Sequence, residues 1–122
     1  MFVSWLSFAC FALAGLIHGG FFIYEVFVLP KHQESAVVKI WARNLGVYNF
    51  CFAVGTFVGL YFVLKLQVML AGVLIGFCGI SMIIAGLTLW FSAPRLQRFA
   101  LLQSVPPALG FVFLTFHVLS KF

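Results

Sequence analysis

Two ionisable side chains, His18 and Glu25, interrupt a long apolar stretch near the start of the sequence. They are seven residues apart, which places them on one face of a helix, two turns from each other. Imidazole and carboxyl groups are common proton donors and acceptors in enzymes. Glu25 and His18 are therefore the candidate catalytic residues of the chain.

Glu25 is the less favourable of the two inside a membrane, because placing a charged carboxylate in a span costs at least about 2.5–3.5 kcal/mol of free energy. It must bind a proton, reach the membrane interface, or pair with Arg43 or His18. A functional carboxylate at this place would bind either a proton or a ligand.

Uncharged polar side chains occur in two other apolar segments. Counted from the nearer basic loop, they and His18 lie at a similar depth of roughly 12–20 Å, with Glu25 one layer closer to the loops. We therefore predict a ligand-binding site made of Glu25, His18, Asn44, Tyr48, Asn49 and Gln103. The alternative interpretation is that these side chains only join helices, at about 1 kcal/mol per hydrogen bond.

Other chemistries find less support in the sequence. Cys10, Cys51 and Cys78 lie in three different apolar segments without metal or redox spacing, so we interpret them as packing residues. A haem between His18 and His117 would need two ligands that differ in depth by about 15 Å. We expect neither a metal nor a cofactor.

The composition places these polar residues in a membrane. Of the 122 residues, 65% are hydrophobic and only 7% are charged, and the mean hydropathy is +1.21. A soluble domain of this size could not bury so much apolar surface. This composition excludes a soluble globular domain, a disordered chain and a nucleic-acid binder, and makes membrane lipid the solvent.

The positions of the charges divide the chain into helices. Charge-free runs cover residues 1–24, 44–64, 66–94 and 99–120, and about 20 apolar residues suffice for one helical crossing. The sequence predicts an all-α membrane protein with four transmembrane helices in one antiparallel bundle. We place the helices at about 3–29, 37–64, 67–92 and 94–120, within a single domain 1–122.

The basic residues also predict an orientation. Lys31, Lys39, Arg43, Arg95 and Arg98 flank the first and third loops, whereas only Lys65 and Lys121 lie at the other side. Because cytoplasmic loops are enriched in Lys and Arg, we expect loops one and three in the cytoplasm and both termini outside.

Small residues and prolines indicate how the helices pack. Close helix contacts are expected at two sets of glycines, Gly55 with Gly59 and Gly72, Gly76, Gly79 with Gly86. We expect these contacts within one bundle in preference to a homo-oligomer, which stays open. Pro106 and Pro107 are expected to bend the fourth helix and to free carbonyls near Gln103.

Three short motifs carry a resemblance to a known family: His18-x6-Glu25-x-Phe27, Asn44-x-Gly46-x-Tyr48-Asn49 and Gln103-x2-Pro106. From about His18 to Gly110 the chain resembles the small four-helix membrane proteins catalogued as domain of unknown function 1304. The resemblance implies a bacterial inner-membrane protein and supplies no activity. Ile17 and Leu45 stand where that family commonly has glutamate and glutamine, which favours a reduced polar site or a different ligand.

Three functions fit this pattern. The first is binding or proton-linked transport of a small lipophilic or cationic molecule by Glu25. The second is an intramembrane enzyme, in which Glu25 or His18 transfers protons and Tyr48 and the asparagines orient a lipophilic substrate. The third is an accessory subunit of a larger membrane complex, whose polar cluster only fixes the bundle.

Overall fold

The structure is a computed structural model that describes residues 2–122, and within them it contains helices and turns but no strand. The elements in chain order are α1 (Trp5–Ile23), η1 (Tyr24–Val28), η2 (Leu29–His32), α2 (Ala36–Leu64), α3 (Val68–Ser92), η3 (Pro94–Leu96) and α4 (Gln97–Leu119). Four segments are long and apolar enough to cross a membrane: Trp5–His32, Ala36–Leu64, Val68–Ser92 and Pro94–Leu119. The all-helical, four-span prediction is confirmed.

Local sequence determines where the helices begin and end. The hydroxyl of Ser4 accepts a hydrogen bond from the Ser7 N–H at 3.0 Å and caps α1. Ser35 caps α2 by accepting from the Val38 N–H at 3.4 Å. Between α2 and α3 the chain reverses at Leu66, whose φ of 58° lies in the left-handed region.

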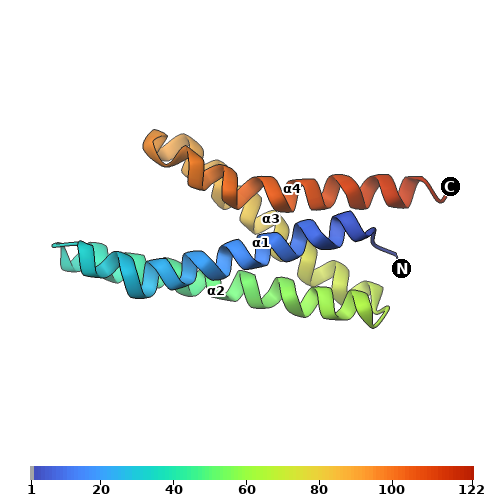
Figure 1. The fold of residues 1–122 in the computed structure, drawn as a ribbon, viewed down its shortest axis with the longest axis horizontal. Helices are drawn as coiled ribbons and strands as arrows, with labels where there is room; N and C mark the ends of the chain where they lie inside the picture. Colours follow the sequence, from blue (N-terminus) through green and yellow to red (C-terminus); the bar gives the residue numbers. More distant parts are fainter. Residues whose placement is uncertain (1) are drawn as a thin grey trace.

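The four long helices form two antiparallel hairpins, α1 with α2 and α3 with α4 (Figure 1). Each helix packs on its neighbours in chain order, and α4 returns to pack on α1, which closes the bundle. Both termini lie at one end, here called the terminal end. The first and third loops lie at the opposite end, here called the basic end.

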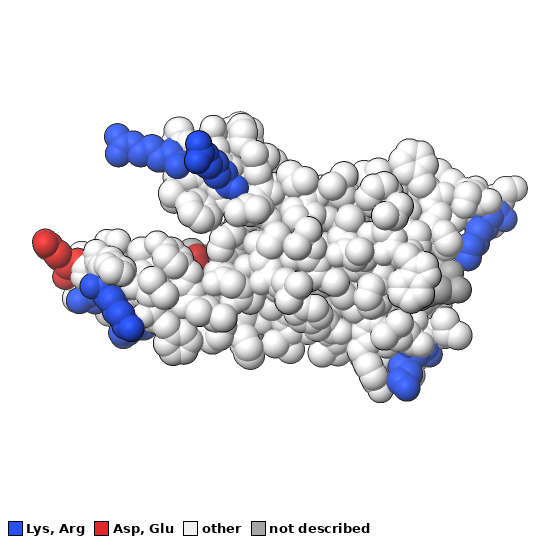
Figure 2. Space-filling view, in the orientation of Figure 1, with Lys and Arg blue, Asp and Glu red and all other residues white. Residues whose placement is uncertain are grey.

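Charged side chains gather at these two ends and leave the surface between them almost uncharged (Figure 2). This distribution is typical of a protein that crosses a membrane several times. The assignment of the basic end to the cytoplasm remains a prediction.

The core lies toward the terminal end, where ring and glycine surfaces fit together. Phe11 is buried and meets Phe111 edge-on at 5.0 Å between ring centroids. A Cβ atom added to Gly110 would lie 2.8 Å from the Phe11 ring, so any larger residue there would force the ring to shift. The hydroxyl of Ser7 donates to the Gly110 carbonyl at 2.7 Å and joins α1 to α4.

Toward the basic end the two hairpins separate. Phe21 of α1 still meets Phe99 of α4 at 6.2 Å between centroids, but η1 and η2 contact only the first hairpin. The ribbon of α4, which contains Pro106 and Pro107, changes direction part-way along (Figure 1). Figure 2 shows the resulting hollow between the hairpins.

The glycine predictions were right in part. Gly55 and Gly59 pack against Cys78 and Ile75 of α3, as expected of contacts within one bundle. On α3, however, Gly79 and Gly86 are close to neighbouring helices whereas Gly72 and Gly76 face open space. Gly72 and Gly76 instead border a small hollow of about 50 Å³, which Phe11 and Phe111 also line.

Candidate functional site

The first transmembrane segment widens into a π-helical turn, η1, where it carries Glu25. The N–H of Leu29 bonds to the Tyr24 carbonyl, five residues back, in place of the usual four. Pro30 follows directly, and proline both lacks an N–H and crowds the carbonyl four residues earlier. Isolated π turns inside helices often occur at functional sites.

Glu25 is hydrogen-bonded to Asn49 across the first hairpin. The Asn49 Nδ2 group donates to Glu25 Oε2 at 2.7 Å. Asn49 is buried, while Glu25 is half-buried and its other oxygen, Oε1, makes no hydrogen bond within residues 2–122. Of the partners considered for Glu25, neither Arg43 nor His18 is used; its partner is a neutral amide.

Gly46 makes this contact possible. A Cβ atom at position 46 would lie 2.7 Å from Val26 Cγ2 and 3.1 Å from Glu25 Cβ. The absence of a side chain therefore lets η1 approach α2 closely enough for Glu25 to reach Asn49. Gly46 is a positioning residue for the pair.

His18 lies deeper in the bundle and is sealed from solvent and lipid, with an exposed fraction of 0%. Its Nδ1 is 2.9 Å from the Ala14 carbonyl, and because a carbonyl only accepts, Nδ1 carries a proton. Nε2 is buried without a partner in the described chain. The rings of Phe21 and Phe52 stand edge-on to the imidazole at 5.7 and 6.3 Å.

Gln103 lies on α4 and is also buried. Two contacts between α1 and α4, Ser7 with Gly110 and Phe21 with Phe99, lie on either side of the level of His18 and Gln103. His18 and Gln103 therefore lie on the terminal side of the Phe21–Phe99 contact. Glu25 lies one turn away on its basic side, at the base of the hollow. Pro107 has no N–H to bond the Gln103 carbonyl, as the sequence predicts.

Asn44 and Tyr48 lie exposed on α2, and Tyr48 is 56% exposed. Within residues 2–122 Glu25 is hydrogen-bonded to Asn49 and to neither of them. By helical periodicity they share the face of α2 that carries Gly55 and Gly59. That face meets α3 at the two glycines. Nearer the basic end, α3 diverges from α2 (Figure 1). Asn44 and Tyr48 therefore border the hollow on its α2 side.

The structure thus divides the six predicted residues into three groups. Glu25 and Asn49 are bonded, Asn44 and Tyr48 are exposed beside the hollow, and His18 and Gln103 are enclosed below an aromatic contact. Sequence reasoning missed the π turn and the role of Gly46. Pro30, five residues after Glu25, was the available signal for the first.

No metal-binding group emerges from the described residues. Within 2–122, no three His, Cys, Asp or Glu side chains lie close enough together to hold an ion. Cys10, Cys51 and Cys78 are free thiols in three different helices. The polar chemistry of the transmembrane region therefore centres on Glu25.

The comparisons with known proteins give a family and no activity. The family described as "Protein of unknown function (DUF1304)" matches residues 12–115, which include all six predicted site residues. A search of curated proteins found no match, and neither did a search of solved structures. With most of its length matched, the chain belongs to the DUF1304 family of proteins of unknown function.

Proposed function

We propose that this membrane protein binds a small lipophilic molecule that carries a positive charge, and that Glu25 exchanges a proton for it. The observation that supports this proposal is the setting of Glu25. Its carboxyl group lies in a membrane-spanning segment, bonded to one neutral amide. Within residues 2–122 no cationic side chain forms an ion pair with it.

The energetics favour an additional partner for Glu25. An ionised carboxylate in a span costs at least about 2.5–3.5 kcal/mol, whereas a hydrogen bond between transmembrane helices contributes on the order of 1 kcal/mol. Asn49 alone therefore does not offset the charge. A proton or a bound cation at the free Oε1 atom would complete the site.

The hollow between the hairpins offers a route to this carboxyl group. Red acidic atoms are visible at its base in Figure 2, as well as at the tip of the first loop. A ligand from the bilayer could enter between the hairpins, with Asn44 and Tyr48 on the α2 side. The Phe21–Phe99 contact would stop it short of His18.

Binding is better supported than acid–base catalysis. A catalytic histidine must touch its substrate, and His18 is fully enclosed. Its hydrogen bond goes to the backbone of its own helix and not toward Glu25. An accessory-subunit role makes no use of the free carboxylate oxygen.

The test is the binding of a lipophilic cation, tetraphenylphosphonium, to the purified protein in neutral detergent. Glu25→Gln keeps the shape of the side chain and removes its charge, so we expect affinity to fall about tenfold, the equivalent of about 1.4 kcal/mol. Wild-type affinity should also fall as the pH is lowered, because protons and the cation compete for Glu25. The Glu25→Gln variant should show no such pH dependence.

Glu34→Gln is the matched control, since Glu34 is the other acidic residue and lies exposed in the first loop. It should bind like wild type. Equal binding by wild type and Glu25→Gln at every pH would overturn the proposal and favour the accessory-subunit interpretation.

A further inference from the structure

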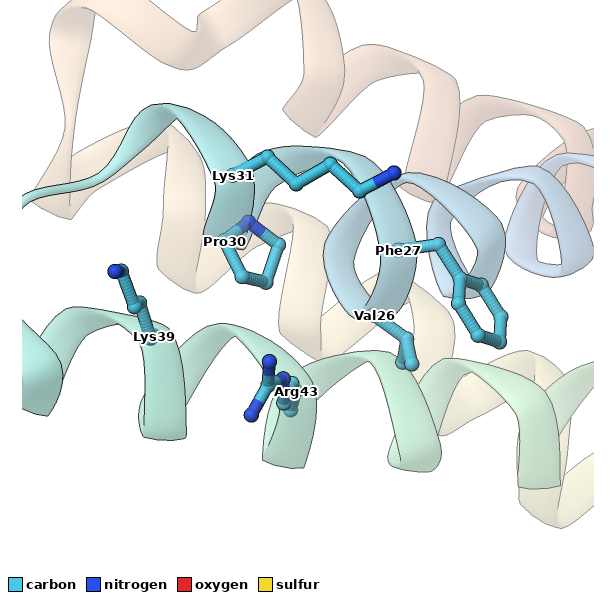
Figure 3. Close-up of a pocket in the computed structure, with 6 residues that line it drawn as sticks. All are labelled: Val26, Phe27, Pro30, Lys31, Lys39 and Arg43. Atoms are coloured by element: carbon cyan, nitrogen blue, oxygen red, sulfur yellow. The ribbon is translucent and has the colours of Figure 1, made fainter.

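A second hollow lies on the first hairpin, between the end of the first span and the start of α2. Its volume is about 380 Å³, within the range of small-molecule pockets, about 300–1,000 Å³. Six residues line it, namely Val26, Phe27, Pro30, Lys31, Lys39 and Arg43 (Figure 3). We call it the basic pocket; neither Glu25 nor Asn49 is part of its lining.

Three cationic side chains from two elements line the basic pocket. Lys31 comes from η2, whereas Lys39 and Arg43 are four residues apart on one face of α2. Figure 3 shows Lys31 and Pro30 on one side and the two α2 residues on the other. No carboxylate of residues 2–122 forms an ion pair with any of the three. Lys39 and Arg43, four residues apart on α2, repel each other, so an anion bound beside them would stabilise this part of the protein.

The other lining residues identify the kind of anion. Val26, Phe27 and Pro30 form an apolar side of the same pocket, at the place where an apolar span gives way to charged residues. A free phosphate ion would gain nothing from this apolar side. A phospholipid has a phosphate and a hydrocarbon chain in the same order along the membrane normal.

We propose that the basic pocket is a specific site for one anionic phospholipid. The headgroup phosphate is bound by Lys39 and Arg43, Lys31 lines the opposite side of the pocket, and the first carbons of one acyl chain lie against Val26 and Phe27. Arg43 can form two parallel hydrogen bonds to phosphate oxygens, which a lysine cannot. Basic pockets between transmembrane helices are known to hold such headgroups. This site is separate from the ligand site proposed at Glu25.

The test counts lipids on the purified full chain by native mass spectrometry during titration with phosphatidylglycerol and with phosphatidylcholine of the same acyl chains. We expect one phosphatidylglycerol to bind at least about tenfold more tightly than phosphatidylcholine. The double variant Lys39→Gln/Arg43→Gln should lose this preference. Millimolar inorganic phosphate or glycerol phosphate should not displace the lipid.

The matched control is Arg95→Gln/Arg98→Gln, which removes two charges from the same end of the molecule but from the second hairpin. It should keep the preference within about twofold. An equal loss in both double variants would overturn the proposal, since it would mean general surface attraction. Displacement by inorganic phosphate would also overturn it and favour a free anion. The charge-conserving variant Lys39→Arg must retain binding.

Discussion

The two halves of this bundle are built from the same kinds of residue but pack in opposite ways. In the terminal half, aromatic rings fill the space left by glycines on facing helices, as Phe11 does beside Gly79 and Gly110. In the basic half, each hairpin stays paired but the two hairpins part beyond Phe21 and Phe99. The polar residues of the membrane region concentrate in or next to the half that opens.

This difference shows where cohesion comes from in a bundle surrounded by lipid. Apolar surface gains little by leaving lipid for protein, so helices stay together where small residues permit close packing or where hydrogen bonds cross between them. The terminal half has both, through Gly110 and the Ser7 hydrogen bond. In the basic half, Gly46 and Gly86 pack within their own hairpins, and nothing comparable joins one hairpin to the other.

The largest effect is expected from Phe11→Ala, which removes the ring that fills the terminal half. Buried Phe→Ala changes cost about 3–5 kcal/mol in water-soluble proteins. We expect about 3 kcal/mol here, because transfer from water makes no contribution. The free energy of unfolding in mixed detergent and SDS micelles measures it.

Phe77→Ala is the control for this prediction, because Phe77 is 69% exposed on α3. It should change the free energy of unfolding by less than about 0.5 kcal/mol. Comparable losses in the two variants would contradict the view that the terminal half holds the bundle together.

The next largest effect is expected from Gly46→Ala in the basic half. The added methyl group would press on Val26 and Glu25, and overpacking of this kind costs about 1–3 kcal/mol. Because η1 must shift, the Glu25–Asn49 bond lengthens and tetraphenylphosphonium binding weakens. Unfolding and binding are measured on the same samples.

Gly72→Ala serves as the control, since a Cβ atom at position 72 meets nothing within 4 Å. It should be neutral or slightly stabilising, because alanine is the better helix former. If Gly46→Ala behaves in the same way, Gly46 has no positioning role.

The sequence was sufficient for the fold because the signals that define it are local. The lengths of the charge-free runs and the proline and serine positions indicate each span within a few residues, without knowledge of any neighbour. The π turn was not predicted, although Pro30 directly follows the residue that closes it, because one continuous α-helix was expected at about 3–29. The prediction of close helix contacts at the α3 glycines was only half right, because such a contact also requires a neighbouring helix that approaches the glycine.

The candidate site depended on direction as well as depth. Depth follows from counting residues along each helix. This count predicts neighbouring layers for Glu25 and Asn49, which the structure joins by a hydrogen bond. Asn44 and Tyr48 are exposed where α3 diverges from α2, and the His18 ring is covered by Phe21. The first fact depends on the separation of the hairpins, which arises from packing between distant segments. The second depends on the orientation of two rings within α1.

A smaller effect is expected from Ser7→Ala, which removes the hydrogen bond between α1 and the Gly110 carbonyl. Such bonds contribute about 0.6 kcal/mol on average and up to about 1.7 kcal/mol in membrane proteins. We expect a loss of about 1 kcal/mol because both partners are buried. Thr115→Ala removes only an exposed bond within α4 and should cost less. If Thr115→Ala costs more stability than Ser7→Ala, the hydrogen bond between α1 and α4 does not help to explain why the terminal half packs more tightly than the basic half.

The smallest effect, and a gain, is expected from Leu66→Gly in the tight turn of the terminal half. Leu66 has a φ of 58°, a conformation that costs residues other than glycine about 1–2 kcal/mol. Glycine adds about 0.5–1 kcal/mol of backbone entropy to the unfolded chain, so the expected net gain is about 0.5 kcal/mol. Leu66 is exposed, and little packing is lost. Gln67 is the neighbouring residue and has a φ of −88°. Gln67→Gly adds the same backbone entropy to the unfolded chain but removes no unfavourable conformation, so it should be destabilising. If both glycine variants lose stability equally, the close approach of α2 and α3 does not strain the turn, and the tight packing of the terminal half comes from its glycine and aromatic contacts alone.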